Sequence, residues 1–266
     1  IAQYVACGIN PEKSKIVIQS HVHQHAELMW ILSSLTYLGE LNRMTQFKDK
    51  SKISKNINAG LYTYPILMAS DILLYQADLV PVGSDQKQHL ELCRDLASRF
   101  NNKYSDTFTI PEPFIPAVGS RIMSLQEPEN KMSKSDKNLN NIIGLLDSYS
   151  DIKRKINRSV TDSEKEIKYS KNKPGLSNLM DIYSILSNES IKKIEDKYTG
   201  KMYSFLKNDL VNIISNHLEP IQYEYSKIMK DKNYLNQVLK NGAKKSSWKA
   251  KRTLSKVYKK VGFIQK

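Results

Sequence analysis

The sequence predicts an α/β fold with a parallel sheet, followed by an all-helical region. Two observations carry this prediction. Short runs rich in β-branched residues, at 15–20 and 78–83, alternate with helical stretches, which is the order typical of parallel strands joined by crossover helices. After about Leu125, only helical patterns remain.

Composition excludes several classes of protein. The chain has 266 residues, 40% of them apolar, and carries 41 Lys+Arg against 27 Asp+Glu. It is therefore too apolar to be disordered and long enough for one large domain or two modest ones. We find no run near the ~20 apolar residues of a membrane helix, and no secretory leader at Ile1. The two residues Cys7 and Cys93 have no disulfide-scaffold or C-x-x-C spacing, which indicates a reducing, cytoplasmic location.

The elements of the α/β part follow from runs of apolar residues and from Gly and Pro as boundaries. Leu92, Leu96 and Phe100 fall on one stripe of an amphipathic helix. In chain order we expect the end of a helix over 1–9, closing near Gly8; a buried strand over 15–20; a helix over 25–38, ending at Gly39; a Lys-rich surface loop over 45–58; a helix over 66–75, started by Pro65; a second buried strand over 78–83; and the amphipathic helix over 85–101.

The later part of the chain changes character. Residues 126–141 are polar and rich in Lys, Ser and Asn, which indicates a mobile loop. Helical patterns then cover 142–158, 176–187, 189–197, 201–217, 219–230 and 243–260. We therefore divide the chain into an α/β domain over 1–125, a loop over 126–141 and a helical domain over 142–266.

The positive charge is concentrated at the C-terminal end. From Lys240 onward the chain has ten basic residues and no acidic one. In the last helix, basic residues face away from an apolar stripe that includes Leu254 and Val257. This pattern hints at an anionic partner. Phosphate contact and a plain solvated helix face explain it equally well.

Asp71 is the most informative single residue. The surrounding helix is apolar on nearly every side, so it should be buried, and a carboxylate there must be paired, hydrogen-bonded or neutral. Tyr64, Met68 and Asp71 are spaced i, i+4, i+7, so they share one face if the helix reaches back to Tyr64. An aromatic ring, a thioether and an acceptor suit a pocket for a flat apolar ligand that bears an N–H group. A structural Asp that caps a neighbouring element is an equally weighted alternative.

Gly83, Ser84, Asp85 and Gln86 follow the second predicted strand, just before a helix. In open α/β sheets, ligands bind at the carboxyl ends of the strands, and a helix N-terminus offers free N–H groups to anions. Asp85 and Gln86 also suit an ammonium group or a ribose hydroxyl. The alternative is that Ser84 or Asp85 only caps the helix.

The pentapeptide Lys131-Met132-Ser133-Lys134-Ser135 is a stronger signal. Two lysines spaced by three, with two hydroxyls, lie in a polar loop. Such a loop is suited to gripping a polyphosphate while charge builds on the leaving group. The alternative is a solvated Lys/Ser linker.

Three histidines, His21, His23 and His25, fall within five residues. If this segment is extended, the three imidazoles face the same way, as a metal site requires. No nearby Cys or acidic residue completes such a site, so we expect a surface turn and no bound metal.

Taken together, the sequence resembles bacterial-type tryptophanyl-tRNA synthetases, which are class I aminoacyl-tRNA synthetases. The matching stretches run through almost the whole chain in one order. They are Q-S-x-V-x-x-H-A-E-L (19–28), G-E-L-x-R-M-T-Q-F-K (39–48), A-G-L-Y-T-Y-P-I-L-M-A-S-D-I-L-L-Y (59–75), V-P-V-G-S-D-Q-K-Q-H (80–89), R-D-L-A-x-R-F-N (94–101), R-I-M-S-L (121–125), K-M-S-K-S (131–135), V-T-D-S-E (160–164), K-P-G-L-S-N-L (173–179) and G-A-K-K (242–245).

The resemblance implies a Rossmann-like catalytic domain, a K-M-S-K-S loop and a helical domain that binds the tRNA anticodon. It implies ligation of L-tryptophan to tRNA(Trp) through Trp-AMP, with ATP as substrate and Mg2+ as the metal ion. It also implies a cytoplasmic homodimer. By family pattern, Asp71 accepts the indole N–H beside Met68, while Tyr64 and Gln86 hold the amino group. The residues along ATP are Gly83, Ser84, Asp85, Ile122 and Met123, together with the loop residues Lys131, Met132, Ser133, Lys134 and Ser135, in which Lys131 and Lys134 stabilise pyrophosphate.

One departure from the family concerns the start of the chain. The family's chain begins about 60 residues earlier, with a first strand and the class I signature of the Rossmann-like domain. We therefore expect this chain alone to lack adenylation activity. Two other functions stay open, a tyrosyl-tRNA synthetase and a non-catalytic RNA-binding remnant of a synthetase.

Overall fold

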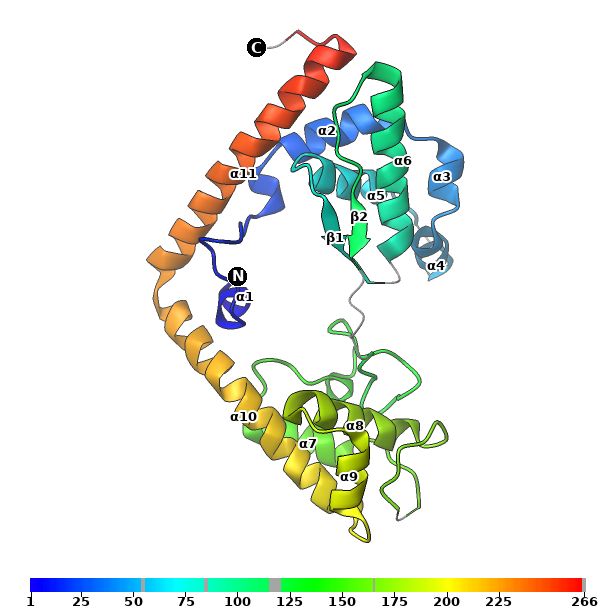
Figure 1. The fold of residues 1–266 in the computed structure, drawn as a ribbon, viewed down its shortest axis with the longest axis vertical. Helices are drawn as coiled ribbons and strands as arrows, with labels where there is room; N and C mark the ends of the chain where they lie inside the picture. Colours follow the sequence, from blue (N-terminus) through cyan, green and yellow to red (C-terminus); the bar gives the residue numbers. More distant parts are fainter. Residues whose placement is uncertain (54–55, 84–85, 115–120, 165, 265–266) are drawn as a thin grey trace. The chain divides into compact units, whose positions relative to one another are not determined.

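The computed structural model describes residues 1–53, 56–83, 86–114, 121–164 and 166–264 (Figure 1). The chain forms two compact units. One comprises Asn10–Ala117 and Asn233–Lys266, and we call it the α/β unit; the other comprises Ile1–Ile9 and Val118–Lys232, and we call it the helical unit. Among the described residues, no helix has the length and apolar character needed to span a membrane.

The α/β unit holds a two-stranded parallel sheet and most of the helices expected around it. In the sheet, Val80 of β1 pairs with Pro113 of β2. The elements of the unit are η1 (Gln19–His21), α2 (Gln24–Ser33), α3 (Leu38–Asn42), α4 (Thr45–Ile53), α5 (Ala59–Leu73), β1 (Leu79–Pro81), α6 (Lys87–Tyr104), β2 (Glu112–Phe114) and α11 (Lys232–Val261).

The core of the α/β unit centres on α5, which packs against α2 and α6. The side chain of Asn58 caps α5 by accepting a hydrogen bond from the Leu61 amide at 2.8 Å. The stripe predicted for α6 is confirmed, since Leu92, Leu96 and Phe100 are all buried. These contacts hold α5, which carries Asp71, between two neighbouring helices.

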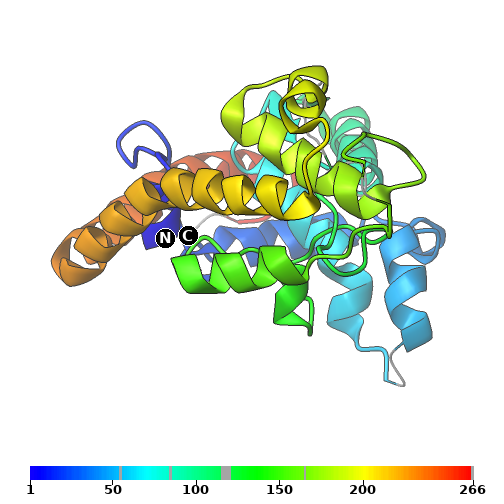
Figure 2. The same ribbon diagram turned by 90° about the horizontal axis from the view of Figure 1, so that it is seen from below.

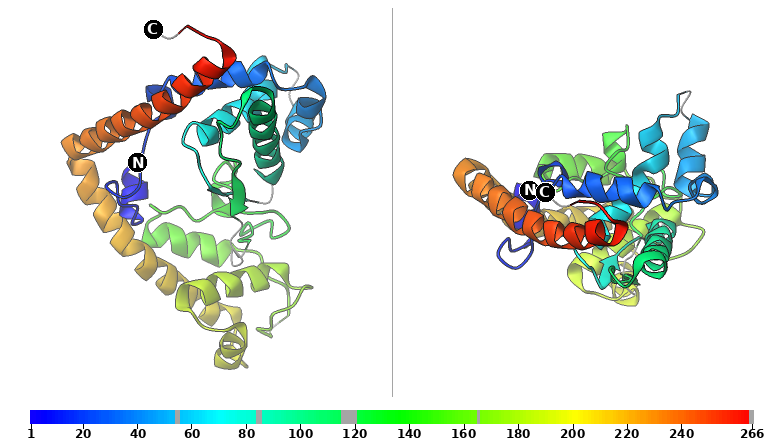
Figure 3. Two further views of the ribbon diagram at one scale, coloured as in Figure 1. Left: turned by 45° about the horizontal axis from the view of Figure 1, so that its top comes forward. Right: turned by 90° about the horizontal axis from the view of Figure 1, so that it is seen from above.

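Helix α11 completes this same core. Its residues Ala250, Leu254 and Val257 belong to the apolar cluster of α2, α5 and α6. It runs beside α2, where the Tyr258 hydroxyl donates to Glu27 Oε2 at 2.7 Å (Figure 3). At Gly242, an added Cβ would lie 1.9 Å from the carbonyl oxygen of Ile16, so only glycine fits there.

The helical unit comprises α1 (Ala2–Ala6), η3 (Leu139–Asn141), α7 (Tyr149–Arg158), α8 (Pro174–Ser187), α9 (Ile191–Tyr198) and α10 (Tyr203–Lys230). Its long helix α10 packs against α1, α7 and α8 (Figure 2). Ser148 and Ser190 cap α7 and α9, each accepting from a backbone amide three residues on. The buried ammonium of Lys207 donates to the Ser159 carbonyl at 2.8 Å, which ties α10 to the end of α7.

The predicted strands need correction. Residues 15–20 form no strand, because no described segment pairs with them, and Gln19–His21 is a 3-10 turn. The second predicted strand shortens to β1, and it is not buried, since Leu79 is 61% exposed. Its partner β2 was not predicted, because a three-residue strand that contains Pro113 gives no alternating pattern.

Several helix boundaries also differ. The loop predicted over 45–58 is largely α4, which Phe47 anchors by an edge-on contact with Tyr62. Helix α2 ends at Ser33, before the predicted limit, and α5 begins at Ala59, so Pro65 lies inside it. Residues 142–148 precede α7 and are not helical. The two helices predicted over 201–230 are one helix, α10, which continues through Pro220.

The observed units divide the chain differently from the predicted domains. Helix α11 was expected in the helical domain, yet its apolar face fills the core of the α/β unit. The segment 1–9 and the loop over 126–141 belong to the helical unit instead. The reason is packing, since α1 contacts α10 and Asn140 of the loop accepts a hydrogen bond from Arg154 of α7.

Candidate active site

Asp71 lies on α5 and is held by two partners, Gln19 of η1 and His25 in the first turn of α2. Gln19 Nε2 donates to Asp71 Oδ1 at 3.0 Å and to Oδ2 at 2.8 Å, and His25 Nδ1 hydrogen-bonds to Oδ1. The prediction that this carboxylate is paired is confirmed, but its burial is incomplete, because the side chain is 35% exposed. A carboxylate offers about four acceptor positions. Among the described residues Oδ2 receives one donor, Gln19, so one of its acceptor positions stays free.

The imidazole of His25 and the phenol of Tyr75 form a hydrogen-bonded chain that ends at Asp71. His25 is 5% exposed, and its Nε2 lies 2.8 Å from the Tyr75 hydroxyl. Burial, and then the negative charge of Asp71, raise the pKa of the Tyr75 phenol above its usual value. The phenol therefore stays neutral, and the relay from Tyr75 through His25 fixes the orientation of the carboxylate. Sequence reasoning did not assign Gln19, His25 or Tyr75 to this site.

The histidine cluster does not form a metal site. His25 turns inward to Asp71, whereas the His23 side chain is 73% exposed and lies 3.5 Å from Glu27. The three imidazoles therefore do not face the same way. Within the described ranges, no group of three His, Cys, Asp or Glu side chains is arranged to hold a metal ion.

Tyr64 lies on α5 about two turns before Asp71, and Met68 lies about one turn before it. The Tyr64 hydroxyl lies 2.8 Å from His89 Nε2 of α6 and donates to Gln46 Oε1 at 3.1 Å. Burial raises the pKa of Tyr64. Met68 is partly buried against the core of the α/β unit. The shared face predicted for Tyr64, Met68 and Asp71 is therefore part of one continuous helix.

The turn after β1 carries the next predicted residues. Gln86 N donates to the Gly83 carbonyl at 2.9 Å, near the carboxyl end of β1. Gln86 is the N-cap of α6. Ser84 and Asp85 lie outside the described residues. Gly83 and Gln86 thus lie between a strand and a helix N-terminus, as the sequence predicted.

The K-M-S-K-S residues continue a short antiparallel pairing in the helical unit. Met123 bridges Lys131, and Met132 N donates to the Ile122 carbonyl at 3.0 Å. Further along the loop, the hydroxyls of Ser133 and Ser135 are 2.9 Å apart. Lys131 and Lys134 are both exposed, and neither forms an ion pair with a carboxylate of the described residues. This arrangement places Lys131 beside Met123, with Lys134 three residues further along the same loop.

Asn178 of α8 fixes this pairing and was missed from the sequence. Its Oδ1 accepts from Met123 N at 2.8 Å, and its Nδ2 donates to Met123 O at 2.9 Å. The side chain is almost fully buried. The available signal was the stretch K-P-G-L-S-N-L, which was quoted for the resemblance but given no role.

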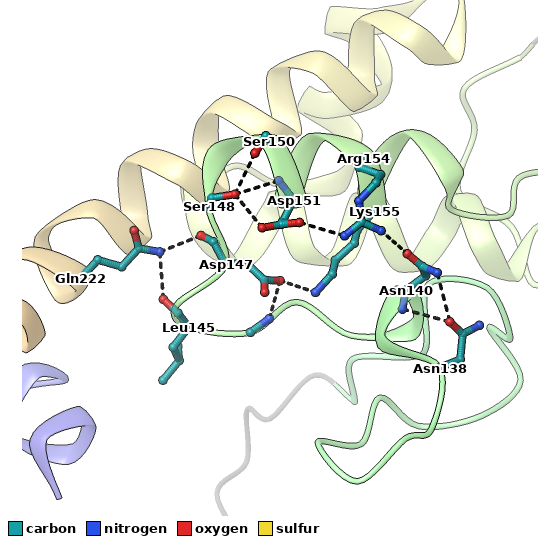
Figure 4. Close-up of polar contacts among 11 residues, drawn as sticks. Asn138, Asn140, Leu145, Asp147, Ser148, Ser150, Asp151, Arg154, Lys155 and Gln222 are labelled. Carbon is teal, nitrogen blue, oxygen red and sulfur yellow. Dashed lines mark hydrogen bonds and ion pairs between the residues drawn. The ribbon is translucent and has the colours of Figure 1, made fainter.

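A polar network holds the segment that follows the lysine loop (Figure 4). Asp136 accepts from Asn141 Nδ2 at 2.8 Å, and this bond, with one from the Asn138 amide, lowers the pKa of Asp136. Arg154 of α7 donates to Asn140 at 2.5 Å. Gln222 of α10 donates to the backbone carbonyls of Leu145 and Asp147, as Figure 4 shows.

A buried ion pair closes the end of this network. The ammonium of Lys155 donates to Asp147 Oδ2 at 2.5 Å, and the same oxygen accepts from Gly144 N at 2.9 Å. The Lys155 side chain is only 6% exposed. Since α7 and α10 both hold this segment, the loop over 131–135 projects from a fixed base.

The candidate site residues therefore fall into two groups. Tyr64, Met68, Asp71, Gly83 and Gln86 lie in the α/β unit. Ile122, Met123 and the loop over 131–135 lie in the helical unit. Each group is ordered within its own unit.

A strand–helix unit with an acceptor-bearing helix, joined in one chain to a helical unit with a K-M-S-K-S loop, is the arrangement that the sequence resemblance implies for a class I aminoacyl-tRNA synthetase. A family model described as tRNA synthetases class I (W and Y) matches residues 1–219. The chain belongs to this family, and within it to the tryptophan–tRNA ligases, as its relatives show.

Two curated relatives are tryptophan–tRNA ligases. The protein from Clostridium acetobutylicum is 55% identical over 266 residues, which cover 99% of this chain and 79% of the relative. The protein from Clostridium tetani is 54% identical and is covered to 78%. These identities support a tryptophan–tRNA ligase rather than the alternative of a tyrosyl-tRNA synthetase.

Solved structures show the same relationship. The tryptophanyl-tRNA synthetase of Mycoplasma pneumoniae matches with a TM-score of 0.87 at 36% identity, covering 99% of this chain and 80% of that one. The enzyme of Campylobacter jejuni, solved with ADP and tryptophan, matches with a TM-score of 0.85 at 33% identity, covering 98% of this chain and 81% of that one. The α/β class and the helical region expected from the sequence are confirmed by these matches.

Proposed function

We propose that the two groups of site residues act together in tryptophan–tRNA ligation. In this reaction, the carboxylate of L-tryptophan attacks the α-phosphate of ATP, which gives Trp-AMP and releases pyrophosphate. The aminoacyl group then passes to the terminal adenosine of tRNA(Trp). The Campylobacter jejuni relative was solved with ADP and tryptophan, which supports ATP and tryptophan as the substrates of this chain.

In this proposal, Asp71 selects tryptophan by accepting the indole N–H. The observation that carries the proposal is that Gln19 and His25 orient the carboxylate, while no other side chain of the described ranges donates to Oδ2. Phenylalanine has no N–H, so it would leave that acceptor unfilled, which is costly in a closed pocket. Met68 lies beside the indole ring. Tyr64 and Gln86 hold the amino group.

The remaining residues bind ATP. Gly83, Ser84 and Asp85 line it from the α/β unit, and Ile122 and Met123 line it from the helical unit. Lys131 and Lys134 stabilise the negative charge that builds on pyrophosphate as it leaves. Met132, Ser133 and Ser135 complete the loop around the phosphates. The nucleotide enters with Mg2+, which binds chiefly through phosphate oxygens.

The proposal extends to partners and location. The helical unit binds the anticodon of tRNA(Trp), and two copies of the chain form a homodimer. A cytoplasmic location fits the free thiols of Cys7 and Cys93, since reducing compartments keep thiols unpaired.

Pyrophosphate exchange in the complete gene product tests the proposal. We expect exchange with tryptophan and not with tyrosine. Asp71→Ala should lower kcat/KM for tryptophan by about 100-fold, since it removes a hydrogen bond to a charged acceptor and releases its two partners. The KM for ATP should change by less than about 3-fold. The matched control is Asp95→Ala, because Asp95 is exposed on α6.

Three outcomes would contradict the proposal. If Asp71→Ala weakened the use of tryptophan and of ATP equally, the assigned role of Asp71 in selecting tryptophan would be wrong. Exchange driven by tyrosine would favour the tyrosyl enzyme. Tight tRNA binding without exchange would favour a non-catalytic RNA-binding protein.

A further inference from the structure

The outward face of α11 carries a set of exposed cations. Among the described residues, none of them forms an ion pair with a carboxylate. We call this set the α11 basic face, and it comprises Lys244, Lys245, Lys249, Lys251, Arg252, Lys256, Lys259 and Lys260. The α11 basic face therefore has no carboxylate partner within the part of the chain that the structure describes.

The helix presents these cations in a fixed direction. Lys245, Lys249, Arg252, Lys256 and Lys259 follow the spacing i, i+4, i+7, i+11, i+14, which places them on one stripe about 21 Å long. The other side of α11 is buried in the core of the α/β unit through Ala250, Leu254 and Val257. The helix therefore cannot turn its charges elsewhere.

An exposed aromatic ring interrupts the stripe. Trp248 is 62% exposed, and the Arg252 guanidinium lies over its ring at 4.7 Å. Both line a surface hollow of about 490 Å³, together with Lys251, Ser255, Lys256 and Lys259. Cations that surround an exposed indole combine phosphate attraction with a surface on which a base can stack.

We propose that the α11 basic face binds the sugar–phosphate backbone of RNA, with Trp248 stacking on a base. Charge complementarity favours this occupant, because a straight row of unneutralised cations matches a polyanion with regular charge spacing. A membrane surface fits less well, since amphipathic helices bind lipid through an apolar face and that face of α11 is buried. The identity of the RNA as tRNA(Trp) rests on the proposed function. The surface itself consists of α11 residues, none of which is assigned to tryptophan or ATP binding.

The test measures tRNA(Trp) binding by the complete gene product as a function of salt. The variant Lys249→Gln/Arg252→Gln/Lys256→Gln should weaken binding at least 10-fold near 0.15 M salt, and it should lower the slope of log K against log salt by about 2 to 3. The matched control Lys13→Gln/Lys48→Gln/Lys103→Gln removes the same charge from exposed lysines elsewhere in the α/β unit. We expect its binding and slope to match those of the unmodified protein.

A second variant separates stacking from charge. Trp248→Ala should weaken tRNA binding by about 1 to 3 kcal/mol, or roughly 5- to 150-fold, without changing the salt slope. Trp248→Phe should restore part of the loss. Circular dichroism and thermal unfolding would establish that each variant is folded.

The results separate this inference from the proposed function, because pyrophosphate exchange does not require tRNA. If the α11 triple variant loses tRNA binding but keeps pyrophosphate exchange, the result supports both the inference and the proposed function. Unchanged tRNA binding by the triple variant, or a loss equal to that of the control variant, overturns the inference and leaves the function standing. Loss of binding to phosphatidylserine vesicles with tRNA binding intact would also overturn it. If the protein shows no pyrophosphate exchange but binds RNA in a way that depends on α11, the result supports RNA binding by the α11 basic face and contradicts the proposed function.

Discussion

Asn178 holds the backbone of Met123 from both sides across 55 residues of sequence, accepting from its amide at 2.8 Å and donating to its carbonyl at 2.9 Å. Met123 in turn bridges Lys131, the first residue of the lysine loop. One buried amide side chain thereby sets the position of the pairing from which this loop extends.

Replacement of Asn178 should therefore affect both stability and nucleotide use. Asn178→Ala leaves the amide and the carbonyl of Met123 without these partners, so we expect a loss of about 2 to 4 kcal/mol in the free energy of unfolding. The KM for ATP in pyrophosphate exchange should rise as well. Urea denaturation and exchange kinetics measure the two effects. Asn172→Ala, at an exposed loop position, is the control. A stability loss with an unchanged KM would argue against Met123 lying along ATP.

A glycine on α11 gives a packing prediction. Gly242→Ala would place a Cβ 1.9 Å from the Ile16 carbonyl oxygen, a backbone atom that cannot move away as a flexible side chain can. We expect about 3 kcal/mol of destabilisation, at the upper end of overpacking costs. Gly39→Ala is the control, because its nearest neighbour would be Arg43 Nη1 at 3.7 Å. Its effect should stay within about 1 kcal/mol. If denaturant titrations gave equal losses of unfolding free energy for Gly242→Ala and Gly39→Ala, the close approach of Gly242 to the Ile16 carbonyl would be contradicted.

The ion pair between Glu40 and Arg99 gives a pH prediction. Burial alone would raise the pKa of Glu40, but hydrogen bonds from Arg99 and from the Tyr37 amide, together with the charge of Arg99, lower this pKa overall. A lowered pKa in the folded state means that the pair stabilises fully above the unfolded value, near 4.3, and loses this contribution as the pH falls through the folded value.

Glu40→Gln should therefore reduce the free energy of unfolding by about 1 to 3 kcal/mol at pH 7, with a smaller difference from the unmodified protein below about pH 4. The control is Glu91→Gln, which removes a more exposed pair with Arg94 at 3.5 Å. That change should cost less than about 1 kcal/mol. A difference for Glu40→Gln that stays constant from pH 7 to pH 3 would contradict the linkage.

The two cysteines should differ in reactivity. Cys7 is exposed, whereas Cys93 is fully buried between α5 and α6, and burial raises the pKa of its thiol to about 12. Since the thiolate is the reactive form and the buried thiol needs local opening, Cys93 should react about 100-fold or more slowly with a thiol reagent at pH 7 to 8. Timed labelling of the native protein, with Cys7→Ser as control, measures this ratio. Comparable rates would contradict the burial of Cys93.

The parts of the fold that were predictable depend on local spacing. The stripe of Leu92, Leu96 and Phe100 on α6 appears in sequence because a helix repeats every 3.6 residues. The same spacing placed Tyr64, Met68 and Asp71 on one face of α5. A strand needs a hydrogen-bonding partner as well as β-branched residues. The strand prediction for residues 15–20 was wrong because composition alone does not reveal whether a partner strand exists. The apolar stripe of α11 showed that the helix packs, but not which unit it packs into.

The unpredicted parts of the site are polar contacts between distant positions. His25 and Asp71 are 46 residues apart, and the side chain of Asn178 reaches Met123 over 55. Such pairs follow from tertiary packing and leave no periodic trace in the sequence. A lone His or Asn can only be assigned once its neighbours are known. The residues that orient the carboxylate and the loop therefore emerged only from the structure.

The split composition of the α/β unit bears on how the protein is made. Residues 10–117 are synthesised before residues 118–232 of the helical unit, but the part of their core that contains Ala250, Leu254 and Val257 is synthesised after them. Until then, the facing surfaces of α2 and α5 stay open to water, and such exposed apolar surfaces invite aggregation and chaperone binding. The core of the α/β unit thus closes only after residues 118–232 of the helical unit have been made, and premature termination within α11 would leave that core incomplete.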